Sequence, residues 1–308
     1  MLPDPTQQRG ITVLERGWLS CNNVLLHGDG TGAVLVDSSH SLHAAQTVAL
    51  VQHALVGEVL LRLVNTHLHS DHCGGNAAVQ QAFGCAISIP PGDFDAAVVW
   101  DASALSYQAT GQRCDRFAPD ARIAPGDVLA VGTRRWNALA APGHDPHSIV
   151  LFDDQNGVLI SADALWENGF GVVFPELDGV AAFDDVARAL DLIASLDARW
   201  VIPGHGAPFG DVAGALSRAR HRLAGFLSQP ERHARHAARV LLKYHLLEVQ
   251  NQPRAEVLHW FESTPLCLAI WQRLDKPEGS PRSYGEAVLG ELLGSGALRL
   301  AGDLVSNA

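Results

Sequence analysis

The densest group of polar, metal-binding side chains in the chain is Asn65-Thr66-His67-Leu68-His69-Ser70-Asp71-His72-Cys73-Gly74-Gly75. The apolar run before it, residues 59–64, predicts a buried strand, and helical spacing predicts a helix over 76–83. If the strand continues through His67 and His69, their imidazoles share one face and reach one ion. The turn at Ser70 then directs Asp71 and His72 toward a second position.

Three more side chains of this kind come directly after predicted strands. The paired strands 127–131 and 136–140 lead to Ala141-Pro142-Gly143-His144, the hairpin 149–152 with 158–161 leads to Asp163, and strand 199–202 leads to Pro203-Gly204-His205. The two oxygens of Asp163 can bridge a pair of metals. Imidazole and carboxylate together suit zinc, iron or manganese. Seven such groups at successive strand ends predict a metal centre.

The order of the predicted elements indicates an α/β sandwich. Short strands at 34–36 and 86–89 and helices over 43–55 and 183–196 extend the alternation of strand and helix. Segment 93–120 is expected to hold a helix and an excursion over the site. From about residue 212 the chain becomes helix-rich and ends in a helix and a short β-ribbon, which is the layout of a winged-helix module. We therefore expect two domains, 1–211 and 212–308.

Composition narrows the classes of function. Hydrophobic residues make up 47% of the 308 residues and charged residues 18%, so a substantial core can be buried. The formal charge of −11 repels phosphate backbones and weighs against nucleic acid as a partner. No apolar run reaches the length of a membrane span. A small-molecule substrate fits these properties best.

The cysteines bear on the compartment. The five cysteines are scattered with no CxxC pair, so neither a disulfide framework nor a thiolate zinc site is expected. The first ten residues, MLPDPTQQRG, show no secretory signal pattern. A reducing cytoplasm is the expected location.

The residue pattern also resembles a known family. His67-Leu68-His69-Ser70-Asp71-His72 is similar to the HxHxDH signature of metallo-β-lactamase-fold hydrolases, and Asp37, His144, Asp163 and His205 match that superfamily's other landmarks in order. The resemblance covers about residues 11–210 and is closest to the glyoxalase II-like and LACTB2-like branch. It implies an αβ/βα four-layer sandwich with a helical, winged-helix-like C-terminal region.

The resemblance also implies which residues hold which metal. His67, His69 and His144 would hold the first ion, Asp71, His72 and His205 the second, and Asp163 would bridge them. The implied cofactors are two divalent metal ions, with zinc as the default and iron or manganese as alternatives. The family mechanism lowers the pKa of a water shared by the metals, and the resulting hydroxide attacks the substrate while Asp71 takes up a proton.

The expected substrate is a small acyl ester, thioester or lactone. Four aromatic residues can line an apolar acyl pocket or belong to the core: Trp100, Trp166, Phe170 and Phe174. Val172 stands where the glyoxalase II branch has arginine, and the tail lacks a clear counterpart of that branch's basic glutathione-binding residues. These departures count against glutathione thioesters.

Other functions stay open at this point. The same metals suit a phosphodiesterase or ribonuclease, which a basic groove beside the site would favour. A mononuclear iron dioxygenase of the persulfide-oxidising type uses a related scaffold, and a non-enzymatic ligand sensor would use the pocket without turnover.

Several individual roles are also open. Asp37 either supports the ligands or caps a turn, and His147 either bonds a substrate or packs against its loop. His233, His236 and His245 are expected on a solvated helix face. Apolar residues of the tail such as Trp260 and Trp271 pack within the chain or form a homodimer.

Overall fold

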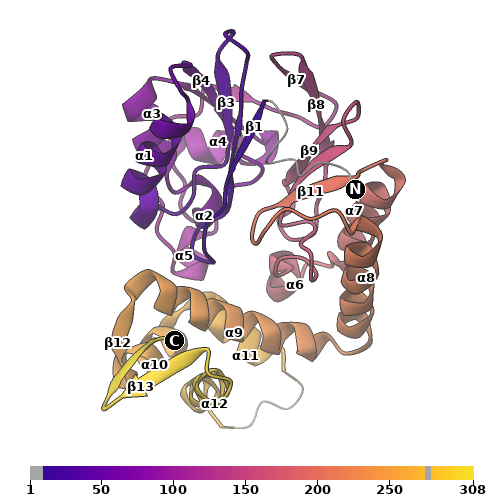
Figure 1. Ribbon diagram of the computed structural model, residues 1–308. Coiled ribbons are helices and arrows are strands. Elements are labelled where there is room, and N and C mark those ends of the chain that lie inside the picture. Colours follow the sequence, from indigo (N-terminus) through magenta and orange to yellow (C-terminus); the bar gives the residue numbers. More distant parts are fainter. Residues whose placement is uncertain (1–9, 275–278) are drawn as a thin grey trace.

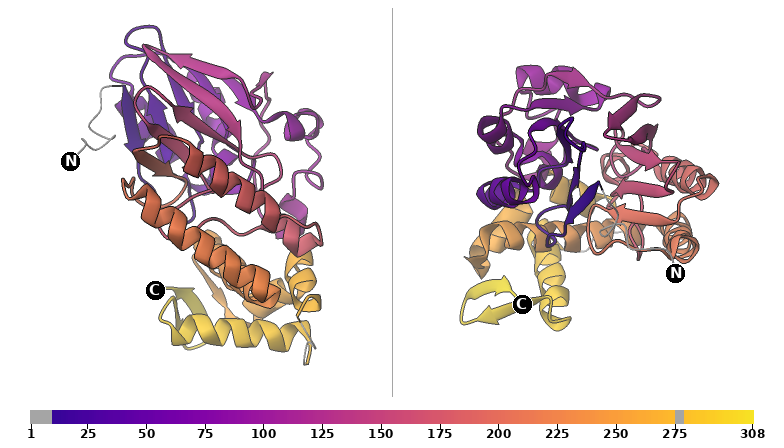
Figure 2. Two further views of the ribbon diagram at one scale, coloured as in Figure 1. Left: turned by 90° about the vertical axis from the view of Figure 1, so that its right-hand side faces the viewer. Right: turned by 45° about the horizontal axis from the view of Figure 1, so that its top comes forward.

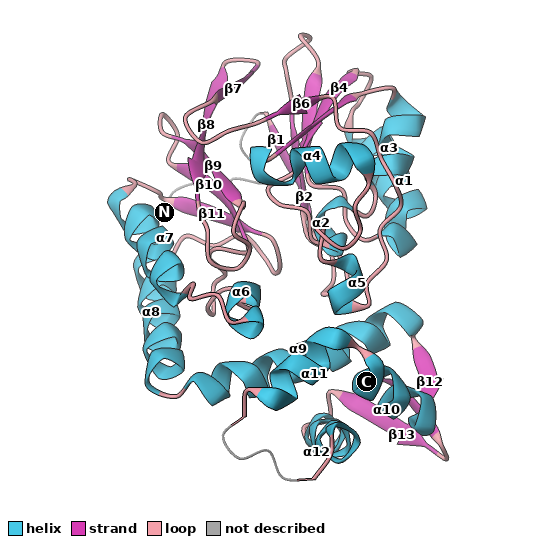
Figure 3. Ribbon diagram, turned by 180° about the vertical axis from the view of Figure 1, so that it is seen from behind, coloured by secondary structure: helices cyan, strands magenta, loops and turns pink. Residues whose placement is uncertain are grey.

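Two β-sheets pack face to face, and helices cover their outer faces, in the computed structural model of the protein (Figure 1). The structure describes residues 10–274 and 279–308. Viewed from behind, α1 and α3 lie outside one sheet and α7 and α8 outside the other (Figure 3). The four layers confirm the αβ/βα sandwich that the sequence predicts.

The first sheet has six strands in the order β1-β2-β3-β4-β5-β6. Strands β1 to β3 are antiparallel, and β3 to β6 run parallel. Their bounds are β1 (Ile11–Leu14), β2 (Asn23–Leu26), β3 (Ala33–Val36), β4 (Leu60–Val64), β5 (Ala86–Ile89) and β6 (Ala121–Arg122). The prediction of a buried strand over 59–64 is correct in position but wrong in part about burial, because Leu61 and Arg62 are exposed.

The second sheet has five strands in the order β11-β10-β9-β8-β7. β10 and β11 are parallel and the remaining neighbours are antiparallel. Their bounds are β7 (Val128–Val131), β8 (Arg134–Ala140), β9 (Ile149–Asp153), β10 (Val158–Ala162) and β11 (Trp200–Pro203). The predicted hairpins 127–140 and 149–161 are confirmed.

Alternation along the strands explains how three hydrophobic layers form. In β2, Val24 and Leu26 point into the core between the sheets, and Leu25 points to the helices outside. Side chains of a strand alternate between its two faces, so a continuous apolar run fills both layers at once. Trp136, fully buried, lies in the core between the sheets, and Phe183 of α7 packs outside the second sheet.

The helices of this part are mostly short. They are η2 (Ser41–His43), α1 (Ala44–Ala54), α2 (Ser70–Cys73), α3 (Asn76–Phe83), α4 (Pro91–Val99), α5 (Tyr107–Thr110), α6 (Phe174–Asp178), α7 (Phe183–Ser195) and α8 (Val212–Ser228). Segment 93–120 contains most of α4, then α5 and a loop. Gly84 ends α3 in a left-handed conformation, which a glycine adopts without steric cost.

The C-terminal part forms its own core below the sandwich, to which Val172 and Leu177 of the sandwich part also contribute (Figure 2). Its elements are α9 (Pro230–Val249), β12 (Asn251–Pro253), α10 (Arg254–Ser263), α11 (Pro265–Gln272), α12 (Pro281–Gly294), β13 (Leu298–Ala301) and β14 (Leu304–Asn307). Three helices followed by the β13–β14 ribbon match the expected winged-helix-like layout, and β12 adds a third strand. Trp260 and Trp271 pack against this core within the same chain.

Helix α9 connects the two parts. It spans 20 residues and lies between the sandwich and the helices α10 to α12 (Figure 1). One side of it contributes Leu241, Leu242 and Leu246 to the C-terminal core. Its other side faces the strand ends at which the predicted metal ligands lie. Among the described helices, none combines the length and the apolar character needed to cross a membrane.

Candidate metal centre

The seven predicted ligands meet at one edge of the two sheets. Asp37 follows β3, residues 67–72 follow β4, His144 follows β8, Asp163 follows β10 and His205 follows β11. The loops after these strands converge, so residues as far apart as 67 and 205 come together. The ligand atoms fall into two groups, within each of which they lie no more than 4.8 Å apart.

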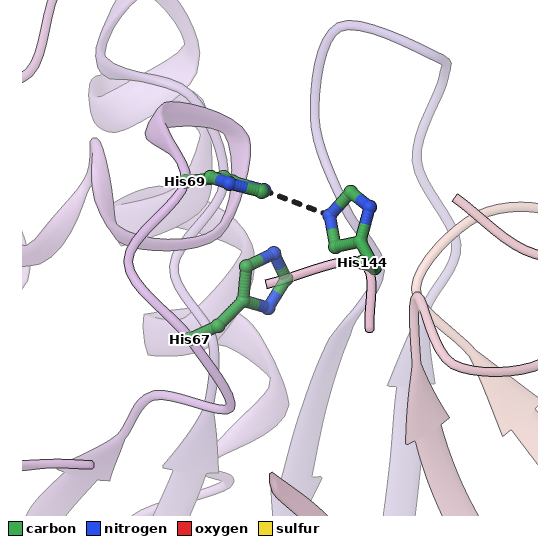
Figure 4. Close-up of side chains that lie close together, drawn as sticks. All are labelled: His67, His69 and His144. Carbon is green, nitrogen blue, oxygen red and sulfur yellow. Dashed lines mark hydrogen bonds between the residues drawn. The ribbon is translucent and has the colours of Figure 1, made fainter. Parts of the chain in front are cut away.

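The first group contains His67, His69 and His144 (Figure 4). His69 Nδ1 lies 2.7 Å from His144 Nε2, and the ring of His67 stands 4.6 Å from that of His69. His144 Nδ1 donates a 2.6 Å hydrogen bond to the carbonyl of Val172. Because that proton is on Nδ1, Nε2 of the neutral imidazole presents its lone pair to the other two rings.

The second group contains Asp71, His72, Asp163 and His205. His205 Nε2 lies 3.1 Å from Asp71 Oδ2, and His72 Nε2 lies 3.4 Å from Asp163 Oδ1. The other oxygen of Asp163, Oδ2, is 3.3 Å from His144 Nε2 in the first group. Asp163 therefore faces both groups, as a bridging carboxylate would.

Two buried imidazole nitrogens without a hydrogen-bond partner indicate whether these residues fit metal ions. Nε2 of His67 and Nε2 of His72 are buried and lack a hydrogen-bond partner. A buried polar atom left in this state costs roughly 1–3 kcal/mol. Both atoms point into the ligand groups, where a metal ion would satisfy them. The donor set of imidazole nitrogens and carboxylate oxygens fits two divalent ions.

Asp37 fixes the orientation of two of these histidines. Its Oδ2 accepts hydrogen bonds from His72 Nδ1 at 2.8 Å and from the hydroxyl of Thr66 at 2.8 Å. Because the Thr66 hydroxyl donates to Asp37, it accepts from His67 Nδ1, at 3.1 Å. Both imidazoles thus carry the proton on Nδ1 and direct Nε2 toward the centre. Of the two roles left open for Asp37, the structure supports that of holding the ligands.

Burial and mutual charge set the protonation of the group. Burial, and then the neighbouring imidazoles, lower the pKa of His67 well below its usual value and that of His69 to about 3. Burial would raise the pKa of Asp71, but His72 and His205 hold it at about 2. Burial would lower the pKa of His72, but Cys21, Asp163, Asp37 and Asp71 raise it well above its usual value. Metals bind neutral imidazoles and ionised carboxylates, so a metal ion would displace this proton from His72.

The ligand side chains are so closely packed that the neighbouring backbone has room only for glycine at two positions. A Cβ on Gly204 would lie 2.2 Å from Asp163 Oδ1, and one on Gly171 would lie 2.3 Å from His144 Nδ1. Glycine is required at both positions because any side chain would displace a ligand. Ala162, immediately before Asp163, has a φ of 46°, a conformation that costs energy for any residue other than glycine.

A cavity of about 770 Å³ opens onto the ligands. Trp166 and Phe174 line it, as proposed for an acyl pocket. Trp166 Nε1 also donates to Asp163 Oδ1 at 3.2 Å. The other two aromatic candidates do not line it: Phe170 is buried against Phe226, and Trp100 packs on Tyr107 and Phe117.

Sequence reasoning missed the residues that α8 and α9 contribute to this cavity. Arg222 of α8 and Arg239, Lys243 and Tyr244 of α9 line it. The hydroxyl of Tyr244 lies 2.9 Å from Ser70 Oγ, beside Asp71. Lys and Arg spaced along a helix that begins near residue 230 were the available signal for Arg239 and Lys243. Arg222 lies on the preceding helix, and nothing in the local sequence links Tyr244 to Ser70, 174 positions away.

Three further histidines have clear positions. His147 packs against Gly92 and lies 3.9 Å from Asp93 Oδ1, away from the ligand groups, which supports the packing role. The expectation that His233 and His245 lie on a solvated face is wrong. His233 is buried and accepts a hydrogen bond from Val173 N, and His245 stacks on Trp260. The side of α9 that carries His233 packs against the sandwich, so this histidine is buried, whereas Arg232 and Arg235 of the same helix are exposed.

The chain is similar in sequence to proteins of a known family. A family model described as the metallo-beta-lactamase superfamily matches residues 16–205. Hydroxyacylglutathione hydrolase from Nitrobacter winogradskyi is 32% identical over 154 residues, which is 49% of this chain and 50% of that protein. Acyl-coenzyme A thioesterase MBLAC2 from Gallus gallus is 29% identical over 162 residues, covering 49% of this chain and 58% of that protein. The chain thus spans about half the length of the curated relatives it matches.

A solved structure matches along the whole chain. A beta-lactamase domain protein from Burkholderia ambifaria covers 100% of this chain and 96% of its own, with a TM-score of 0.59 and 20% identity. At that identity the likeness concerns the fold alone. It extends to the C-terminal helices and the β13–β14 ribbon.

Proposed function

The chain belongs to the metallo-β-lactamase superfamily, and from that premise we propose that it is a metal-dependent hydrolase of acyl thioesters with two metal ions. The observation that carries the proposal is the pair of ligand groups joined by Asp163, with unpartnered nitrogens of His67 and His72 directed into them. The two curated relatives support the choice of bond, since hydroxyacylglutathione and acyl-coenzyme A are both thioesters.

The proposed assignment of ligands follows the geometry. His67, His69 and His144 would hold one ion, Asp71, His72 and His205 the other, and Asp163 would contact both. When bound, such ions supply Lewis-acid polarisation of the carbonyl and a water of lowered pKa. Zinc is the default for this donor set, and iron and manganese are compatible with it.

Residues of the chain itself accept the proton and bind the acyl group during hydrolysis. Water adds to the thioester carbonyl carbon, the C–S bond breaks, and the sulfur leaves as a thiol after taking a proton. Asp71 lines the cavity, and its Oδ2 lies 3.1 Å from His205 Nε2, so it is placed to accept the proton that the attacking water loses. Phe174 and Trp166 offer an apolar wall for the acyl chain and exclude water from it.

A substrate panel tests this function. The purified protein is assayed against a matched set of thioester, oxygen ester, lactone and phosphodiester substrates, with and without chelator. We expect chelator-sensitive hydrolysis with the highest kcat/KM for the thioester, restored by adding back metal. Turnover of the ester or lactone alone, or hydrolysis that survives complete removal of metal, would reject the proposal.

One observation favours a second candidate function. Arg222, Arg239 and Lys243 line the cavity and give it a basic side, which is the feature expected of a phosphodiesterase or ribonuclease on the same metals. Cleavage of a single-stranded RNA oligonucleotide by the metal-loaded protein, faster than any thioester is hydrolysed, would place this candidate first.

A further inference from the structure

A second cavity of about 740 Å³ lies between α8 and α9. Four arginines and two histidines line it, and no acidic residue does: His221, Arg222, Arg232, Arg235, His236 and Arg239. In a chain with a net charge of −11, such a concentration of positive charge is local and specific to this place. The cavity therefore suits an anionic group.

The two cavities are adjacent. Arg222, His236 and Arg239 line both of them, so a ligand can extend from one into the other past these three side chains. On α9, residues 232, 235, 236 and 239 recur at helical spacing, and Lys243 continues the same stripe toward the metal ligands. Tyr244, one residue further, contacts Ser70, the neighbour of the ligand Asp71.

Several of the arginines retain unused capacity for an anion. Among the described residues, neither Arg222 nor Arg232 forms an ion pair with a carboxylate; Arg222 donates to the carbonyl of Phe170. Arg235 has a loose contact with Glu231 of its own helix, at 3.6 Å, and Arg239 pairs with Glu291 at 2.9 Å. Burial, and then Arg222 and Arg239, lower the pKa of His236 to about 4, in keeping with the positive potential there.

The separation of the two ends restricts the ligand. Arg235 and Tyr244 are nine positions apart on α9, which corresponds to about 13 Å along a helix. A substrate that reaches both must carry its anionic groups on a long arm. In glutathione the carboxylates lie close to the sulfur, whereas in a nucleotide-bearing thiol such as coenzyme A a long neutral arm separates the sulfur from the phosphates.

We propose that the basic cavity between α8 and α9 binds the phosphate groups of a nucleotide-bearing thiol, the leaving group of the thioester that the metal centre hydrolyses. This inference rests on the proposed function and assigns its substrate class. Arginine suits the role because its planar guanidinium binds phosphate oxygens in pairs. The neutral arm would lie along α9 between Arg239 and Tyr244, with the acyl group against Phe174.

The test compares two substrates that differ only in the phosphorylated adenosine nucleotide that coenzyme A carries. Decanoyl-coenzyme A and S-decanoyl-pantetheine are hydrolysed by the native protein and by an Arg232→Ala/Arg235→Ala double variant. We expect the native kcat/KM ratio of the two substrates to favour decanoyl-coenzyme A roughly tenfold or more, the size of a lost charged hydrogen bond, and the ratio to approach one in the variant. Arg220→Ala, an exposed arginine of α8 that pairs with Asp191, should keep the native ratio.

A binding measurement separates this inference from the proposed function. Adenosine 3′,5′-bisphosphate is titrated into the metal-loaded protein by calorimetry, and we expect binding that the double variant weakens at least tenfold and Arg220→Ala does not. If no thioester is hydrolysed yet the bisphosphate binds in this manner, the proposed function fails and the phosphate site stands. Equal hydrolysis of the two thioesters by the native protein would overturn the phosphate site and leave the thioesterase intact. Binding of single-stranded RNA that depends on Arg232 and Arg235, without binding of the bisphosphate, would also overturn it.

Discussion

Asp37 Oδ2 and His72 Nδ1 are joined by a buried hydrogen bond of 2.8 Å. Through the Thr66 hydroxyl the same carboxylate also sets the proton on His67. Asp37, the residue directly after β3, thereby orients one imidazole in each of the two ligand groups. Asp37 itself has a φ of 58°, a region that aspartate tolerates better than most residues, and this conformation lies at the end of the strand beside the ligands.

Replacing Asp37 tests this support. Asp37→Ala removes the acceptor for His72 and Thr66, so both imidazoles lose their fixed tautomer. We expect metal affinity to fall about 10- to 100-fold, measured by competition with a chromogenic chelator. Asp154→Ala, in the exposed β9–β10 turn, serves as the control and should bind metal as the native protein does. Native metal affinity in Asp37→Ala would show that the ligands need no such support.

Replacing Asp163 should reduce metal binding and turnover more than replacing a residue, such as Asp37, that only orients the ligands. Asp163→Ala removes the only described carboxylate that faces both groups, so we expect fewer than two metals per chain. Turnover should fall by more than the roughly 10- to 100-fold expected for a residue that acts through a ligand. Metal analysis and kcat are measured on the same preparation. Two tightly bound metals in this variant would contradict the bridging role.

Stability should depend on pH through His233. Val173 N donates to His233 Nε2, and burial, followed by His236, lowers the pKa of His233 to about 4. Above the ordinary pKa of 6.5 the imidazole is neutral in both states. As the pH falls toward 4 the unfolded chain takes up the proton first, so stability declines, by about 2 kcal/mol at pH 5 from this residue.

The variant His233→Gln isolates that effect. Its amide oxygen can accept the Val173 N–H without titrating, so the free energy of unfolding should decline less between pH 7.5 and pH 5 than in the native protein. His53→Gln, on the exposed side of α1, should leave the native pH dependence in place. Denaturant unfolding at both pH values gives the comparison, and identical slopes in all three proteins would exclude His233 as the cause.

The C-terminal core should depend on Phe261. Its side chain is fully buried among α9 to α12, and a Cβ on Gly285 would lie 2.9 Å from its ring. Phe261→Ala opens a cavity there, and we expect a loss of about 3–5 kcal/mol. Leu300→Ala, at a side chain 46% exposed on β13, should change stability by less than about 0.5 kcal/mol. Equal losses in the two variants would show that the core is not packed around Phe261.

Much of the sandwich and its ligands could be predicted from the sequence because local patterns encode them. The helix over 76–83 and the strand over 86–89 agree with α3 and β5 to the residue. The ligands are recognisable because they lie in the segments that follow strands, two of them directly after Pro-Gly. Segment 93–120 was less clear, since α5 is only four residues long and is held by packing against α11, far away in the sequence.

The features that could not be predicted from the sequence are those that depend on how the C-terminal part packs against the sandwich. The amphipathic pattern of α9 suggests one buried side and one solvated side, but the sandwich packs against part of the second side and buries His233, while Arg232 and Arg235 stay exposed. The same contact brings Tyr244 to Ser70 and places Arg239 in both cavities. Such contacts arise from tertiary packing between distant segments, for which the local sequence carries no signal.

The most direct test of the two-metal thioesterase is a metal titration followed by activity. Metal-free protein is titrated with zinc, and hydrolysis of an acyl thioester is recorded at each step together with bound metal. We predict that activity rises until two equivalents are bound and then levels off. A plateau at one equivalent, or full activity before any metal is added, would contradict the two-metal centre.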